Sequence, residues 1–258
     1  MCKQKQYGII WKELGLSEGK INMIISAAQL RVKKGLIVGA SIVVGAYMAL
    51  AGVAAHAVDS SFNQTISAGT LATEILDGSR ATVASPSVTM SGITFSFDCQ
   101  EGGSASTGTF GTTSERIYVS NPDAADNGWT LGLAATGGNT SFWDGAGADF
   151  DFNDPTGATQ GCEDGGDTDS LAGQLAVDPS GGTITADCGS CTTTNVSQGS
   201  SSAFNEGSTD SINLLTAASG SDDIWRGYLT GVGLSQTIPA ETPADSYSID
   251  LTVTVTAS

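Results

Sequence analysis

The chain has 258 residues and a formal net charge of −17, with 27 acidic residues against 10 basic ones. The last lysine is Lys34 and the single histidine is His56, so residues 58–258 contain 25 acidic residues, three arginines, and no lysine or histidine. This composition argues against nucleic-acid binding and excludes a P-loop, a histidine metal site and a histidine-dependent catalytic centre in that region.

An uncharged apolar run, Gly35–Ala57, follows a basic cluster and ends in a small–x–small sequence. This order is typical of a secretory signal with cleavage after Ala57. Because roughly 20 apolar residues can span a bilayer, an uncleaved membrane anchor is the alternative. We therefore predict that residues 1–57, with a long basic lead at 1–34, are a signal peptide or signal anchor. Residues 58–258 are predicted to form an exported, extracellular domain that reaches the membrane only through 35–57, if these remain.

Short runs of alternating apolar and polar residues follow the apolar segment, separated by turn residues, and no helix of ordinary length is evident after residue 58. Such a pattern predicts an all-β fold, an antiparallel β-sandwich of the immunoglobulin-like or jelly-roll type. The expected strands cover residues 62–66, 71–76, 88–99 with a bulge at 91–92, 117–119, 129–133, 212–215, 224–234 and 247–255.

Residues 137–211 are dominated by Gly, Ser, Thr and Asp, with short apolar pieces between them. A stretch of this length without regular structure is uncommon inside a compact domain. We therefore expect a long insertion in the sandwich, held by disulfides.

Four cysteines follow the apolar segment, and an even number in an exported chain favours two disulfides. Spacing does not select among the three possible pairings. The Cys-Gly-Ser-Cys motif also fits a redox or zinc site, but neither a helix start nor a second paired-ligand motif accompanies it. The disulfide candidates are Cys99, Cys162, Cys188 and Cys191.

Two further motifs stand far apart in the sequence. The first is Gly-Trp-Thr-Leu at 128–131, and the second is Tyr-Ser-Ile-Asp-Leu-Thr-Val-Thr-Val at 247–255. Together they resemble WxL-domain surface proteins, which implies a β-sandwich bound non-covalently to the cell wall. Val253 stands where that family has its second Trp, and Val255 replaces its Leu. The matching motif residues are Trp129, Leu131, Tyr247, Leu251 and Thr252.

The alternative to this resemblance is that any exported β-sandwich can bury a tryptophan and end in a Thr/Val strand. The stretch 61–71 is similar to the mature start of TasA/camelysin-type matrix proteins. That second resemblance implies polymerisation by lending a terminal strand, 58–71, to a neighbouring copy.

Acidic stretches at 149–154 and 163–169 are rich in the oxygen ligands that Ca²⁺ prefers. An EF-hand beginning at Asp149 fails, because Asp154 replaces the required Gly and Gln160 the required Glu. A strand with its acids in solvent is the alternative. We expect a calcium site here, since so many carboxylates repel one another without a counter-ion. The candidate ligands are Asp149, Asp151, Asn153, Asp154, Asp167 and Asp169.

These observations predict a non-enzymatic exported surface protein. Its expected partners are cell-wall or envelope polymers, other surface proteins or itself. The alternative is a self-assembling matrix or filament subunit.

Overall fold

The computed structural model describes residues 64–67, 69–123, 127–154, 160–165 and 169–258. The predicted signal or anchor at 1–57 lies outside them. Among the residues described, no helix is long and apolar enough to cross a membrane.

The part of the chain that the structure describes is all-β, apart from one short 3₁₀ turn, η1, at Gly102–Ser104. All strand pairs in it are antiparallel. The strands are β1 Ala72–Leu76, β2 Ser106–Phe110, β3 Arg116–Asn121, β4 Trp129–Ala135, β5 Phe142–Trp143, β6 Phe150–Asp151, β7 Gln174–Asp178, β8 Thr183–Ala186, β9 Val196–Gln198, β10 Ser202–Ala203, β11 Ile212–Ala217, β12 Trp225–Thr230, β13 Val232–Thr237 and β14 Leu251–Ala257.

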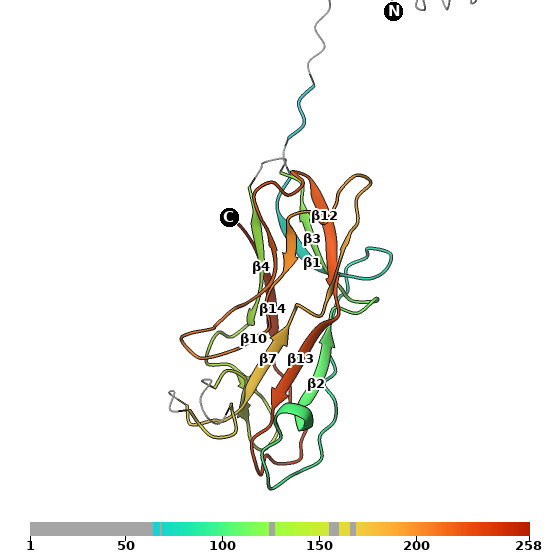
Figure 1. The fold of residues 1–258 in the computed structure, drawn as a ribbon. Helices are drawn as coiled ribbons and strands as arrows, with labels where there is room; N and C mark the ends of the chain where they lie inside the picture. The colour runs from blue at the N-terminus through green and yellow to red at the C-terminus, as the bar shows by residue number, and fades with distance from the viewer. Residues whose placement is uncertain (1–63, 68, 124–126, 155–159, 166–168) are drawn as a thin grey trace, which may run out of the picture. The chain divides into compact units, whose positions relative to one another are not determined.

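The strands form three four-stranded sheets and one small hairpin. The first sheet has the order β1-β3-β12-β8, the second β10-β7-β13-β2 and the third β14-β4-β11-β9, while β5 pairs with β6. The short connections from β2 to β3, β7 to β8 and β12 to β13 each lead from a strand of one of the first two sheets to a strand of the other. Figure 1 shows these two sheets one above the other, with β4 and β14 beside them.

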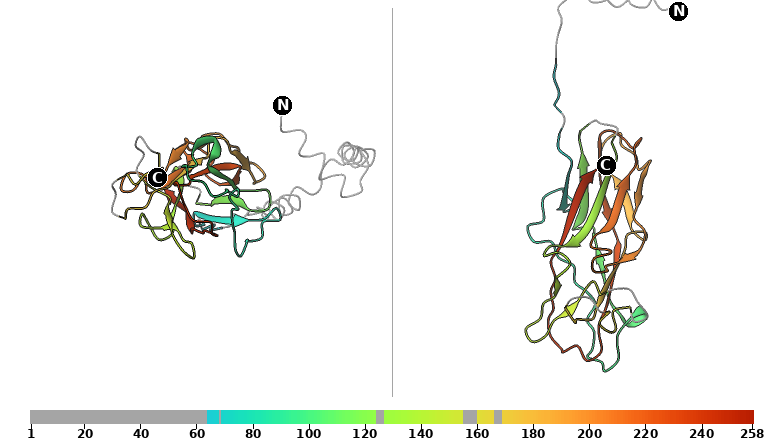
Figure 2. Two further views of the ribbon diagram at one scale, coloured as in Figure 1. Left: turned by 90° about the horizontal axis from the view of Figure 1, so that it is seen from below. Right: turned by 90° about the vertical axis from the view of Figure 1, so that its left-hand side faces the viewer.

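The core lies between the third sheet and the other two. In β4 the alternation is strict, because Trp129, Leu131 and Leu133 are buried while the residues between them are partly exposed. The indole rings of Trp129 and Trp225 lie 5.3 Å apart and join the third sheet to the first. This packing of antiparallel sheets is consistent with a β-sandwich, and its layers can be followed in Figure 2.

The prediction of one continuous strand over residues 224–234 is wrong. The structure has two strands, β12 and β13, which belong to different sheets. Between them, Gly231 has a φ of +79°, a conformation that a residue with a side chain rarely adopts. Its N–H donates to the carbonyl of Gly111 at 2.7 Å, which ties together the bends between β12 and β13 and between β2 and β3.

Two other predicted strands, 62–66 and 88–99, have no counterpart among the described residues. Ile66 is 87% exposed, and residues 62–63 lie outside the description. Residues 88–99 join no sheet and bend at 97–98, although the Ser91 N–H donates to the Thr107 carbonyl at 2.6 Å. Their apolar side chains at Ile93, Phe95 and Phe97 are exposed, so the alternation does not mark a buried face.

The insertion predicted at 137–211 is also too long. Strand β7 lies between β10 and β13, and β8 and β9 complete the edges of the other two large sheets. Leu175 and Val177 belong to the main core. These strands are short and flanked by Gly, Ser and Asp, so the composition of the segment concealed them. Residues 174–203 therefore belong to the sheets.

Candidate functional site

A groove of about 560 Å³ lies between β1 and β14, the edge strands of the first and third sheets. Its rim includes Thr73 and Glu74 from β1 and Thr252 from β14. Its interior is lined mainly by aliphatic side chains from distant parts of the sequence. They include Ile75, Val88, Met90, Leu133, Leu175, Leu234, Ile249, Leu251 and Val253.

A second cavity of about 300 Å³ adjoins the first and shares Met90, Trp143 and Tyr247 with it. Its aromatic wall is ordered by ring contacts, since Trp143 stacks on Phe150 at 5.8 Å and Phe150 meets Tyr247 edge-on at 4.8 Å. Trp143 Nε1 donates to Gln236 Oε1 at 2.9 Å, which fixes the indole. We call the two cavities together the β1–β14 groove.

The backbone of β14 offers hydrogen-bonding groups to this groove. The carbonyl of Asp250 accepts from the N–H of Thr136, and the N–H of Ser258 donates to the carbonyl of Gly128. The backbone N–H and C=O groups of the even-numbered residues of β14 therefore point towards β4. In an antiparallel ladder the odd-numbered residues then point their N–H and C=O groups away from β4. Ile249, Leu251 and Val253 have no backbone hydrogen-bond partner among the described residues. The groove is therefore bordered by an open strand edge.

The charges that line the groove are acidic. Glu74, Asp245 and Asp250 belong to its lining, which contains no arginine. Burial, together with the charges of Asp245 and Asp149, raises the pKa of Tyr247. The groove is thus suited to an apolar ligand that is neutral or positively charged.

The three arginines that follow the apolar segment are engaged elsewhere. Arg80 forms an ion pair with Asp187, and the guanidinium of Arg226 donates to the backbone carbonyl of that residue. Arg116 lies over the ring of Tyr228 at 4.6 Å.

The two motifs predicted from the sequence come together in space. Strands β4 and β14 are paired, with Leu131 opposite Val255. Trp129 and Leu131 are 1% and 0% exposed and belong to the core, so neither can touch a ligand without unfolding. Tyr247, Leu251 and Thr252 line the groove. The motif residues thus divide into core and groove positions.

Three of the predicted calcium ligands are neighbouring buried residues. Asp151 and Asp154 are 1% and 0% exposed, and Asn153 lies buried between them. Oδ1 of Asp151 accepts from the Phe152 N–H at 2.6 Å, and Oδ1 of Asp154 accepts from the Gly165 N–H at 2.9 Å.

The other predicted calcium ligands lie apart. Asp149 and Asp169 are exposed and accept backbone N–H groups, and Asp167 is outside the description. Within the described ranges, no group of three or more His, Cys, Asp or Glu residues is arranged to hold a metal. Calcium binding stays a prediction.

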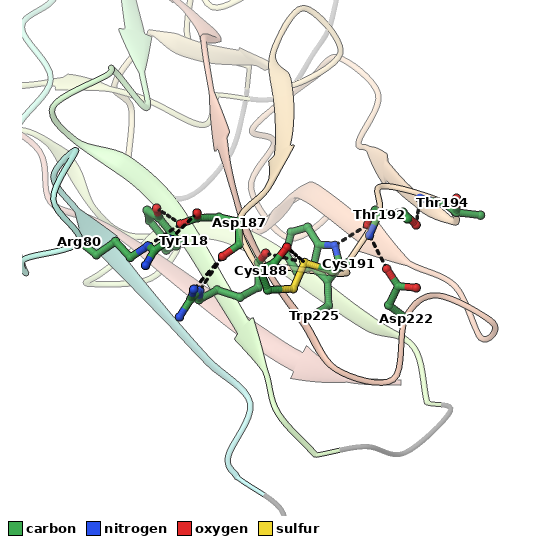
Figure 3. The surroundings of a disulfide bond; sticks show 10 residues. Arg80, Tyr118, Asp187, Cys188, Cys191, Thr192, Thr194, Asp222 and Trp225 are labelled. Carbon is green, nitrogen blue, oxygen red and sulfur yellow. Dashed lines mark hydrogen bonds and ion pairs between the residues drawn. A yellow bond between two sulfur atoms is a disulfide. The ribbon is translucent and has the colours of Figure 1, made fainter. Parts of the chain in front are cut away.

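The prediction of two disulfides is confirmed, with the pairs Cys99–Cys162 and Cys188–Cys191. The first joins the extended segment at 88–99 to the region between β6 and β7. The second closes a four-residue loop after β8 (Figure 3). The two sulfur atoms of the Cys-Gly-Ser-Cys motif are bonded to each other, and a disulfide offers no thiolate to a zinc ion.

An ion-pair network beside the second disulfide escaped the sequence analysis. Asp187 accepts from Arg80 Nε at 2.7 Å and from the Tyr118 hydroxyl at 2.6 Å (Figure 3). The guanidinium of Arg80 lowers the pKa of Asp187 to about 2, and burial raises the pKa of Tyr118. None of these three residues lines the groove, so the network serves to hold the loop after β8. The one feature of the sequence that could have indicated this network is the rarity of arginine after residue 57.

Comparison with known proteins gives no relative: no family model, no curated protein and no solved structure matches this chain.

Proposed function

We propose that this chain is an exported, non-enzymatic protein of the cell surface that binds an envelope polymer or another surface protein non-covalently. The observation that carries the proposal is the β1–β14 groove. It is open, largely apolar and bordered by the C-terminal motif residues Tyr247 and Leu251. Two disulfides support an oxidising, extracellular location.

The proposed kinship is to WxL-domain proteins, with an immunoglobulin-like or jelly-roll arrangement of the sandwich. The pairing of β4 with β14, which brings the two motifs into adjacent strands, supports it. Val253, at the position of the family's second Trp, lies in the groove lining. A change of ligand relative to the family is therefore expected at this position.

Co-sedimentation with cell-wall sacculi from the producing cells tests the function. The protein should sediment with sacculi, and Leu251→Asp, which places a charge in the groove, should release it. Thr254→Asp is the matched control, because Thr254 is an exposed residue of the same strand. Failure of the unaltered protein to sediment, with or without Ca²⁺, would reject the proposal.

A second candidate function is a self-assembling matrix or filament subunit, with residues 58–71 as the exchanged strand. The exposure of Ile66, at 87%, favours it, because this apolar side chain is not packed on its own domain. Electron microscopy of the protein should then show fibres that disappear when residues 58–71 are deleted. A protein that remains monomeric at high concentration would exclude this candidate.

A further inference from the structure

Strand β14 lacks the features that usually protect the edge of a sheet. Its sequence, Leu-Thr-Val-Thr-Val-Thr-Ala, contains no charge and no proline, and its pairing with β4 runs without a register shift. Natural proteins discourage pairing at edges with charges, prolines, bulges or very short strands. A seven-residue edge without them is suited to accept another strand.

The inward side chains of β14 point to the same conclusion. Leu251, Val253 and Val255 face the core but are only half-buried. Leu133 and Leu131, which lie opposite Val253 and Val255 in the neighbouring strand, are fully buried because strands flank β4 on both sides. One more strand along β14 would cover these side chains and fill the β1–β14 groove.

We propose that the groove binds an extended segment of another polypeptide, which pairs with the odd-numbered backbone groups of Ile249, Leu251 and Val253. Such strand addition gains affinity from main-chain hydrogen bonds and specificity from pockets that receive alternate side chains. The aliphatic lining accepts apolar residues at every second position of the segment.

The acidic rim selects basic residues at the ends of this segment. Glu74, Asp245 and Asp250 repel an anionic polymer and attract lysine or arginine. The chain's own segment at 60–70 carries no basic residue, so it matches the rim less well than a foreign basic segment does. A glycan fits less well too, because aliphatic side chains line the larger cavity and a strand edge borders it.

This inference rests on the proposed function and identifies its ligand, and calorimetry with synthetic peptides tests it. The probes are an alternating Val/Thr peptide with lysines at both ends, the same peptide with glutamates at the ends, and a peptide of residues 60–70. The protein is purified from an exporting host. We expect the lysine peptide to bind roughly tenfold more tightly than the glutamate peptide. No binding of the lysine peptide, or tighter binding of the 60–70 peptide, would overturn the inference.

Two variants of Val253 test whether the bound segment pairs with the backbone of β14. Val253→Pro removes an outward N–H and leaves the bonds to β4 intact, so binding should weaken about tenfold. Val253→Ala keeps that N–H and removes only side-chain contact from the groove lining, so it should weaken binding less than Val253→Pro does. Both disulfides, seen by intact mass, and an unchanged circular dichroism spectrum establish that the variants fold. If Val253→Pro does not fold, a variant that combines Glu74→Gln, Asp245→Asn and Asp250→Asn should remove the preference for lysine over glutamate. A preserved preference, or full binding by folded Val253→Pro, would contradict the proposal.

Sacculi treated with protease separate this inference from the proposed function. The inference predicts that proteolysis of the sacculi abolishes co-sedimentation. Equal sedimentation with treated and untreated sacculi would leave the surface function standing and reject the polypeptide ligand. Sedimentation with neither would reject the function itself.

Discussion

Leu131→Ala and Leu251→Ala should separate stability from binding, although both residues belong to the same predicted motif set. Leu131 is completely buried and lies opposite Val255 on one side and Leu215 on the other. Its truncation removes about three buried carbons and leaves a cavity, which together should lower the free energy of unfolding by about 3 kcal/mol. Leu251 is half-buried at the groove, so its truncation should cost about 1 kcal/mol.

Urea unfolding with the disulfides intact, followed by tryptophan fluorescence, measures the stability of both variants. Co-sedimentation with sacculi, under conditions where each variant is folded, measures their binding. We expect Leu131→Ala to bind normally and Leu251→Ala to lose most of its binding. Loss of binding by a fully folded Leu131→Ala variant would refute the division of the motif into core and groove residues.

Three further predictions concern residues outside the groove. Because the pKa of Asp187 is lowered from 3.8 to about 2, its ion pair should stabilise the protein above pH 4 and lose this effect as the pH falls towards 2. The contribution should be about 1 kcal/mol, allowing for the 22% exposure of the carboxylate. An Arg80→Gln variant unfolded in urea across this range should show a weaker pH dependence, because the Tyr118 hydroxyl and Arg226 still lower the pKa of Asp187. Gly231→Ala should cost about 1–2 kcal/mol because of its positive φ, since no atom closer than 3.8 Å opposes the added Cβ; an unchanged urea midpoint would contradict this. Ca²⁺ at about 100 times its Kd should stabilise the folded protein by about 2.7 kcal/mol, seen as a higher melting temperature that chelation reverses. Asp151→Asn combined with Asp154→Asn should abolish the shift, and identical melting curves with Ca²⁺ and with chelator would exclude a calcium site.

Strands whose alternation reflects a buried face could be predicted from the sequence. Those at 129–133 and 247–255 were expected where β4 and most of β14 lie, because Trp, Leu and Val at every second position leave few other arrangements. The alternation of Ile93, Phe95 and Phe97 led to the wrong prediction of a strand at 88–99, because these side chains are exposed. Apolar residues at every second position therefore do not by themselves predict that a strand joins a sheet or that its apolar side chains are buried.

The groove could not be predicted from the sequence. Its walls come from residues such as Glu74, Trp143 and Val253, which are distant in the sequence and meet only through the pairing of β1 with β3 and β14 with β4. Disulfide pairing was equally inaccessible, because spacing alone permits three solutions for four cysteines. Residues 174–203 were misjudged because their strands are too short to dominate the local composition.

Amide hydrogen exchange along β14, followed by NMR, tests the central claim most directly. In the free protein the amides of Thr252 and Thr254 are bonded to β4 and should exchange slowly, while those of Leu251 and Val253 should exchange fast. Addition of solubilised envelope proteins should slow the exchange of Leu251 and Val253. Bound protein in which these two amides still exchange fast would contradict the assignment of the β1–β14 groove as the binding site.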